Sequence, residues 1–210
     1  MVKTKRHDVA TESRILDAAR QIFRQKGYAG ARMEEIAEKA QINKSMLHYY
    51  YRSKERLFEV VFTSDVGEMA PHIIQLLVSD LPLLDKIRAF VGAYLDMITA
   101  HPYIPGFVIN ELNRNQGDLL QTIRSRAGGL DQLTVFFRQV ETEIWQGRIR
   151  PVDPRHLLIT MISACVFPFI ARPIIQMALQ LDEAGFQAFI EERKQHLTNF
   201  IISGLVIRAV

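Results

Sequence analysis

Apolar residues recur every three or four positions along most of this 210-residue chain. That spacing puts them on one face of an α-helix. We find no sustained alternation of apolar and polar positions and no Asn-Gly hairpin signal, which strands would require. The pattern therefore predicts an all-α protein of about nine helices.

Residues 32–62 carry the most informative pattern. A short amphipathic helix is expected over 34–39, followed by a break at Gln41-Ile42. Asn43 can begin a second helix, because its side-chain oxygen can accept from the free N–H groups of the first turn. Two short helices joined by a tight turn are typical of a DNA-binding helix-turn-helix.

The second of these helices has an unusual outer face. Leu47 and Tyr51 fall together on the helical wheel and are expected to face inward. The alternative is that Tyr49, Tyr50 and Tyr51 all belong to the core, but consecutive helical residues point about 100° apart. We therefore expect polar and aromatic groups that can bond to DNA on the outer side and flanks: Lys44, Ser45, Met46, His48, Tyr49 and Tyr50.

These features together resemble the N-terminal domain of TetR-family transcriptional regulators. The resemblance covers about residues 10–62. Its motifs are Ile-Leu-x-Ala-Ala…Phe…Lys-Gly-Tyr in the first helix, Ile36-Ala37 in the second, Leu47-x-x-Tyr50-Tyr51 in the third and Ser53-Lys54-Glu55-x-Leu57 opening the fourth. The chain departs from the family pattern at Gln41, where glycine is usual, at Arg32-Met33 and at Ser45-Met46.

The resemblance implies specific DNA contacts. Tyr49, Ser45 and Met46 are expected at base edges in the major groove, and Lys44, Tyr50 and Lys54 at phosphates. Arg32 and His48 complete the expected DNA-binding set. The resemblance also implies that the fourth helix transmits movement between a ligand-binding domain and the DNA-binding domain.

Charge is unevenly distributed along the chain. Residues 1–60 contain 13 Lys and Arg against 8 Asp and Glu, whereas the chain as a whole carries only +3. Positive charge therefore accompanies the expected DNA reader, as phosphate neutralisation requires. Residues 1–10 read as a basic arm that contacts DNA or as a solubilising tail. We divide the chain into this arm, a DNA-binding domain over 11–52 and a helical ligand-binding and dimerisation domain over 53–210.

The second domain is expected to be helical throughout. Helices are predicted at about 53–78, 82–101, 103–115, 119–146, 155–180 and 183–207, with an Asp-capped turn at 147–154. The segment 119–146 is either one long helix or two helices that break at Gly128-Gly129. The last two carry broad apolar stripes, which predict a four-helix interface between two copies of the chain. An intrachain core is the alternative. The expected interface residues are Leu158, Ile162, Phe169, Phe200 and Ile201.

One acidic residue suggests an effector pocket. Glu111 falls on the apolar face of the helix at 103–115, although buried carboxylates are rare unless paired. It could instead pair with Arg114 at the rim. A pocket for a mostly apolar small molecule would be lined by Tyr94, Phe107, Glu111, Trp145 and Met161.

Catalysis finds little support in the sequence. The catalytic motifs H-E-x-x-H, G-x-S-x-G and Cys-x-x-Cys are missing, and the six histidines show no metal-ligand spacing. Cys165 lies in an apolar run that reads as an inert buried thiol, and it fits a reducing cytoplasm. The longest uncharged stretch, residues 157–171, is shorter than a membrane span. We expect no cofactor.

The sequence therefore indicates a ligand-responsive, dimeric, cytoplasmic DNA-binding regulator. It is expected to act as a repressor that a small molecule releases from a palindromic operator. The alternative is a DNA-binding protein of similar N-terminal fold that has no sensor role. A ligand cavity among the C-terminal helices would discriminate between the two.

Overall fold

The computed structural model describes residues 2–114 and 130–207. These residues form ten α-helices and one short 3-10 helix, and their only β-type pairing is an isolated bridge between Ile149 and Val206, so the all-α prediction is confirmed. The helices are α1 (Val2–Gly30), α2 (Met33–Lys39), α3 (Lys44–Tyr50), α4 (Lys54–Val78), α5 (Leu83–Ala100), α6 (Ile104–Arg114), α8 (Leu133–Trp145), α9 (Pro154–Ile170), α10 (Arg172–Leu179) and α11 (Glu183–Leu205), with η1 at Leu130–Gln132.

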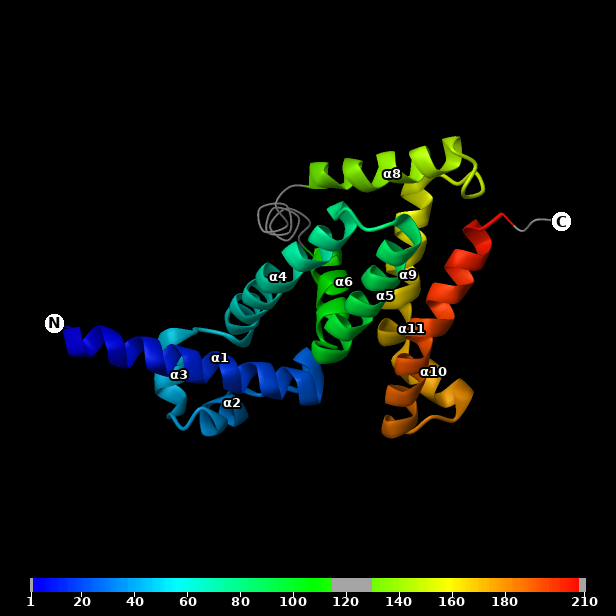
Figure 1. The fold of residues 1–210 in the computed structure, drawn as a ribbon. Helices are drawn as coiled ribbons and strands as arrows, with labels where there is room; N and C mark the ends of the chain where they lie inside the picture. Colours follow the sequence, from blue (N-terminus) through cyan, green and yellow to red (C-terminus); the bar gives the residue numbers. More distant parts are fainter. Residues whose placement is uncertain (1, 115–129, 208–210) are drawn as a thin grey trace.

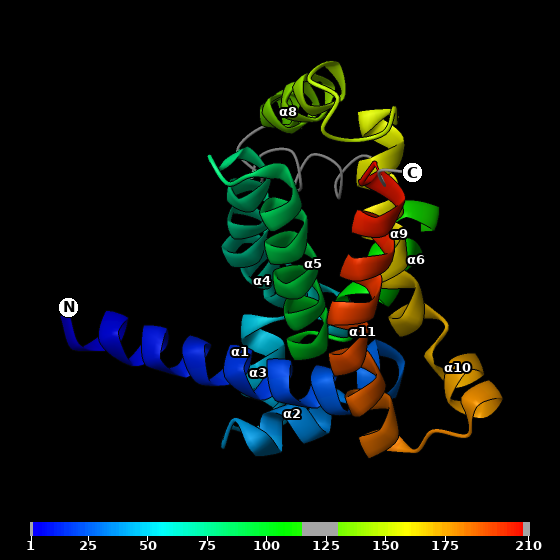
Figure 2. The ribbon, with the colours of Figure 1, turned by 45° about the vertical axis from the view of Figure 1, so that its right-hand side comes forward.

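The helices form two regions that α4 connects. Figure 1 shows α1, α2 and α3 grouped at one end of the molecule, with α4 leading from them to the remaining helices. Helices α4, α9 and α11 all pack against α5, and α8 crosses the end that lies away from α1–α3 (Figures 1 and 2). The N-terminal end of α1 extends away from the rest of the fold in both views.

Polar side chains define where several helices begin. Asn43 accepts a hydrogen bond of 2.7 Å from the backbone N–H of Met46, and Ser53 accepts one of 3.2 Å from Arg56. Asp153 caps α9 in the same way. Each cap satisfies a backbone donor that has no partner within the helix, which typically stabilises the helix by about 1 kcal/mol. The caps predicted at Asn43, Ser53 and in the 147–154 turn are confirmed.

Helix α1 begins at Val2, so most of the predicted arm is helical, as its lack of internal Gly or Pro permits. One expectation about helix boundaries was wrong. The predicted helix 155–180 is two helices, α9 and α10, that meet at a bend of 75°. Pro173 lies in the first turn of α10, where its missing N–H is tolerated, and it disfavours continuation of the helix from α9. Most of the predicted helix 119–146 before α8 lies outside the described residues.

The two regions have separate hydrophobic cores. The first core combines α1–α3 with parts of α4 and α6, and its centre is aromatic: the ring centroids of Phe23 and Phe58 lie 4.6 Å apart, and those of Phe58 and Phe107 4.4 Å. This core therefore extends beyond residue 52, where the sequence placed the domain boundary. The second core unites α4, α5, α8, α9 and α11.

No single described helix is long and apolar enough to cross a bilayer. Helices α9 and α10 reach the required length and apolar character only when taken together, across their 75° bend.

A buried carboxylate links α1, α4 and the connection between α5 and α6. Asp65 on α4 is 3% exposed. Its Oδ1 accepts from Arg20 Nε at 2.7 Å, its Oδ2 accepts from the Tyr103 hydroxyl, and His101 Nδ1 lies 3.2 Å from Oδ2. Arg20 also donates to Ser64 Oγ at 2.9 Å and to Asp17 at 3.0 Å. This set, which we call the Asp65 cluster, joins the DNA-binding region to the helical body.

The charge of Asp65 is stabilised by its neighbours. Burial acts to raise the pKa of Asp65, but the hydrogen bonds from His101, Tyr103 and Arg20 outweigh that effect and lower the pKa below its ordinary value. The carboxylate therefore stabilises the folded chain most above about pH 5, and this contribution is lost as the pH falls through about 4.

Replacing Asp65 by Asn should lower the free energy of unfolding by about 2–4 kcal/mol, because charge-assisted bonds are lost at a buried site. The slope of stability against pH between about 3 and 5 should also decrease. Urea unfolding at several pH values measures both effects. Asp17→Asn is the matched control: it removes an exposed partner of the same Arg20 and should cost less than about 1 kcal/mol. Equal losses for the two variants would contradict the role of burial.

Candidate DNA-binding surface

The turn between α2 and α3 has a geometry that fixes their relative orientation. The backbone N–H of Ile42 donates to the carbonyl of Ala37 at 3.0 Å, and that of Gln41 donates to Glu38 at 3.0 Å. Between them Gln41 adopts a left-handed φ of 56°. This is the hydrogen-bond pattern of a Schellman motif, in which glycine usually takes the left-handed position. Gln41 thus holds a strained conformation at the position where the family usually has glycine.

Helix α3 lies with one face in the first core and the other in solvent. Leu47 and Tyr51 are buried, as predicted, and the Tyr51 hydroxyl donates to Glu12 on α1 at 3.2 Å. The outer positions Lys44, Ser45, Met46, His48 and Tyr49 are exposed, and Tyr50 is half-buried. The Tyr49 side chain is 84% exposed, so a large aromatic ring with a hydroxyl projects from this helix without packing against the protein body.

Neighbouring groups orient the exposed face of α3. The ring of Tyr50 meets that of Tyr49 edge-on, with centroids 5.6 Å apart. His48 Nδ1 lies 3.2 Å from the carbonyl oxygen of Arg52. Lys44 forms an ion pair with Glu34 on α2, and this contact lowers the pKa of Glu34. The pairs of Lys44 with Glu34 and of Tyr51 with Glu12 join positions 10 and 39 apart in sequence, so the helical pattern did not reveal them.

Lys54 has a structural role that the sequence did not indicate. Its ammonium donates to the carbonyls of Tyr28 at 3.0 Å and Ala31 at 3.1 Å, and it lies 4.6 Å from the centroid of the Tyr28 ring. Lys54 therefore links the start of α4 to the end of α1 and the α1–α2 connection by hydrogen bonds. Because an ammonium has three protons, Lys54 keeps one that it can donate to another group. Arg32, at the N-terminal cap of α2, is exposed.

This geometry presents a short, firmly held helix whose polar aromatic face is open to solvent beside basic residues. Residues 15–61 match the family model of bacterial regulatory proteins, tetR family. The chain carries a TetR-family DNA-binding domain.

Similarity extends beyond the matched domain. The transcriptional regulator RutR of Escherichia coli K12 is 28% identical over 169 residues, which cover 74% of this chain and 72% of RutR. The transcriptional repressor NicS of Pseudomonas putida is 27% identical over 182 residues, 85% of this chain and 84% of NicS. These relatives are regulators of transcription.

Solved structures share the fold of this chain. HlyIIR, a hemolysin II transcriptional regulator, superposes with a TM-score of 0.58 at 22% identity, over 94% of this chain and 98% of HlyIIR. FadR of Bacillus subtilis, solved in complex with stearoyl-CoA, gives 0.57 at 16% identity, over 91% and 98%. At these identities the similarity concerns the fold.

The residues predicted to line an effector pocket do not gather in one place. Phe107 packs in the first core, whereas Tyr94 and Met161 belong to the second. Trp145 is 86% exposed at the end of α8, so assigning it to a pocket was wrong. The helical wheel of α8 did not reveal that Trp145, the last residue of this helix, is exposed to solvent. Glu111 is within α6, but its side chain lies outside the described part of the structure.

The predicted dimer residues divide between two faces. Leu158 and Ile201 are buried in the second core of their own chain, so they are not available to a partner. Ile162 and Phe169 are half-buried, and Phe200 is 75% exposed. Because α9 and α11 are apolar on more than one face, periodicity alone did not show which face the chain itself covers. Further large apolar side chains are exposed on these three C-terminal helices at Ile159, Phe167, Ile170, Ile174, Met177 and Leu179.

Replacing Gln41 by Gly should raise the free energy of unfolding by up to about 1 kcal/mol, because glycine adopts a positive φ without strain. Thermal unfolding measures the change. Gln75→Gly, in the interior of α4 on an exposed position, is the matched control and should destabilise by about 1 kcal/mol. A destabilised Gln41→Gly variant would contradict strain at this turn.

Substitutions on α3 should separate base reading from phosphate binding. Tyr49→Ala should change the preferred DNA sequence, whereas Lys44→Ala should weaken binding on all sequences and flatten the salt dependence by about one unit of slope. Mobility-shift titrations at several salt concentrations measure both. Because each side chain is exposed, neither variant should alter the unfolding temperature. Unchanged DNA affinity and preference in both would refute the assignment.

Proposed function

We propose that this regulator is a cytoplasmic, dimeric repressor that binds a palindromic operator through α3 and is released from it by a small-molecule effector. The observation that carries the DNA-binding part is the exposed face of α3, with Tyr49 at its centre. The Asn43 cap and the buried Leu47 hold this face rigidly, as sequence reading in a groove requires. The function of NicS as a repressor is consistent with the same role here.

The proposed contacts follow the geometry of the face. Tyr49, Ser45 and Met46 would meet base edges in the major groove, with Lys44 and Tyr50 on phosphates. DNA binding would require Lys44 to break its ion pair with Glu34 and to pair with a phosphate instead. Breaking this ion pair costs little free energy, because both side chains are exposed. The remaining flanking contacts would come from Arg32, His48 and the third proton of Lys54.

A second copy of the chain would supply the second reading helix. The exposed apolar residues on α9, α10 and α11 form the proposed dimer surface, with Phe200, Phe167 and Ile159 as its largest members on the long helices. Monomeric proteins rarely expose so many large apolar side chains on adjacent helices. Two-fold symmetry would place two copies of α3 on the two halves of a palindrome.

The proposed effector site lies between α5 and α9, around Tyr94 and Met161. The Tyr94 ring stacks on Phe90 with centroids 5.3 Å apart, and burial raises the pKa of Tyr94 to about 12. Its hydroxyl thus stays protonated at neutral pH and could donate a hydrogen bond within apolar surroundings. A mostly apolar molecule with one acceptor suits such a site. It would act by favouring a dimer whose two α3 helices are wrongly spaced for DNA.

Selection of binding sites from a random double-stranded DNA pool tests the regulatory function. The proposal expects a sequence with two-fold symmetry; absence of any enriched sequence would overturn it. Thermal-shift screening of small molecules, followed by mobility shifts with the selected DNA, then tests the sensor role. Compounds that stabilise the protein and release the DNA support an effector, whereas ligand-independent binding would favour a DNA-binding protein without a sensor.

Replacing Phe200 by Glu should disrupt the dimer without unfolding the protomer, because this side chain is exposed in the single chain and a buried charge at an interface is costly. Light scattering should show twice the protomer mass of 24.1 kDa for the unmodified chain and a lower mass for the variant. Trp145→Glu, an equally exposed aromatic away from the proposed dimer surface, is the matched control and should stay dimeric. A monomeric unmodified chain with full operator affinity would contradict the proposal.

A further inference from the structure

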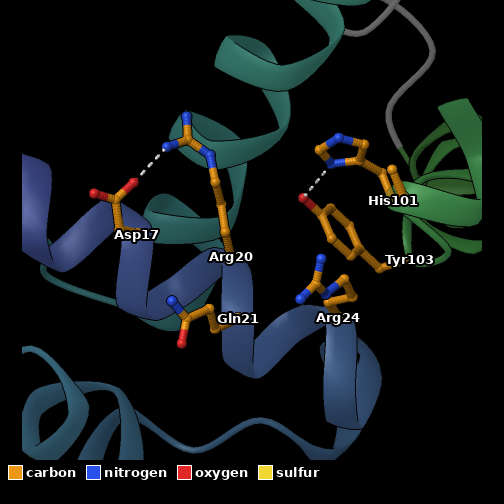
Figure 3. A pocket seen from close by; sticks show the side chains of 7 residues that line it. Asp17, Arg20, Gln21, Arg24, His101 and Tyr103 are labelled. Atoms are coloured by element: carbon orange, nitrogen blue, oxygen red, sulfur yellow. Dashed lines mark hydrogen bonds and ion pairs between the residues drawn. The ribbon is translucent and has the colours of Figure 1, made fainter.

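A cleft opens where the DNA-binding region meets the helical body. Its volume is about 350 Å³. One wall is α1, and the other is the connection between α5 and α6, with His101 and Tyr103 (Figure 3). Figure 3 shows Arg24 with its guanidinium directed into the space between α1 and Tyr103, whereas the Gln21 side chain lines the cleft further from Tyr103. The cleft therefore lies between two parts whose relative position matters for DNA binding.

The wall on α1 consists of polar residues at helical spacing. Asp17, Arg20, Gln21 and Arg24 recur at intervals of three, one and three, so they share one face of the helix. Arg20 is occupied by Asp65, Ser64 and Asp17. Within the described residues, by contrast, no carboxylate pairs with Arg24. The cleft thus contains a guanidinium with free donors, and the Gln21 amide, which can also donate, lines the same cleft.

We propose that this cleft binds a small anion carrying a carboxylate or phosphate group, held by Arg24 and Gln21 on α1 and by the His101–Tyr103 segment opposite. A guanidinium presents paired N–H donors that match both kinds of oxyanion. This site is separate from the effector site proposed between α5 and α9, and the proposal does not depend on it.

The negative groups nearby leave room for an anion at the Arg24 end. Both oxygens of Asp65 are already bonded, and the carboxylate is buried behind Tyr103 and Arg20. Asp17 pairs with Arg20 and lies two helical turns from Arg24, about 10 Å along α1. Burial and Asp65 raise the pKa of Tyr103, while Arg20 and Arg24 act against that rise, which indicates that both cations lie close to the hydroxyl. The positive charge that is free to meet an anion therefore lies at the Arg24 end of the cleft.

A bound anion would connect the two walls. Arg24 lies on α1, whereas His101 and Tyr103 lie on the connection between α5 and α6. An oxyanion bonded to both would strengthen the link that the Asp65 cluster already makes and would hold α1 at one angle to α6. Such a ligand would favour one spacing of the reading helices over others, because it binds that arrangement better.

The experiment is thermal unfolding of the full chain at pH 7 and constant ionic strength, in sodium chloride with increasing inorganic phosphate or, separately, succinate. At about ten times the dissociation constant, the unfolding temperature should have risen by about 3–5 °C, and it should then keep rising with the logarithm of the anion concentration. A rise with phosphate alone, with succinate alone or with both supports the site and identifies the anion class. No rise above the sodium chloride control with either anion overturns the proposal.

Substitutions of single residues test whether the anion that raises the unfolding temperature binds in this cleft. Arg24→Gln should weaken the response at least tenfold, and Gln21→Glu should do the same by placing a carboxylate beside the anion. Both positions are exposed, so the variants should fold. Arg88→Gln, an exposed arginine on α5 away from the cleft, and Lys44→Ala on the DNA-binding surface should respond like the unmodified chain. An undiminished response in both cleft variants, or its loss in Lys44→Ala, would show that anions bind elsewhere.

Discussion

The carboxylate of Asp65 is buried on α4, yet it stays charged because groups from two other segments of the chain bond to it. Arg20 comes from α1, and His101 and Tyr103 come from the connection between α5 and α6. An isolated charge could not be buried at this depth without a large loss of stability. The arrangement therefore requires α1, α4 and α6 to stay together, and it does so where the DNA-binding region joins the body.

The aromatic rings beside this cluster make the same connection without charge. Phe23 on α1, Phe58 on α4 and Phe107 on α6 pack in one core. A rotation of the helical body that moves α6 would thus displace α1 directly and would displace α3 through the first core. Hinge-like movement of the whole DNA-binding region is easier than deformation of such a packed core. This is a physical route by which a ligand in the body, or an anion in the cleft, could alter the position of α3.

The reading surface itself is simple by comparison. Its rigidity comes from the Asn43 cap, the Schellman turn at Gln41 and the buried Leu47 and Tyr51. The cap and the turn are local to α2 and α3, whereas Leu47 and Tyr51 are buried in the first core, which includes parts of α4 and α6. The strain at Gln41 indicates that stability at the turn is not maximal in this chain, since glycine would fit the same φ.

Interactions between residues close in sequence allowed many of the helices and their N-terminal ends to be predicted from the sequence alone. Periodicity predicted helices nearly throughout, and the short polar side chains Asn43, Ser53 and Asp153 marked where helices begin, because capping depends on residues only a few positions apart. The exposed face of α3 followed from the same helical wheel.

Tertiary structure decided the rest. Only packing showed that Leu158 and Ile201 face their own chain while Phe200 does not, since α9 and α11 are apolar on more than one side. Trp145 is exposed to solvent at the end of α8. Lys54 donates to backbone carbonyls more than twenty positions earlier in the chain, and Asp65 accepts from Arg20, which is forty-five residues away in sequence. Such contacts depend on how helices are placed relative to one another, which the period of a single helix does not contain.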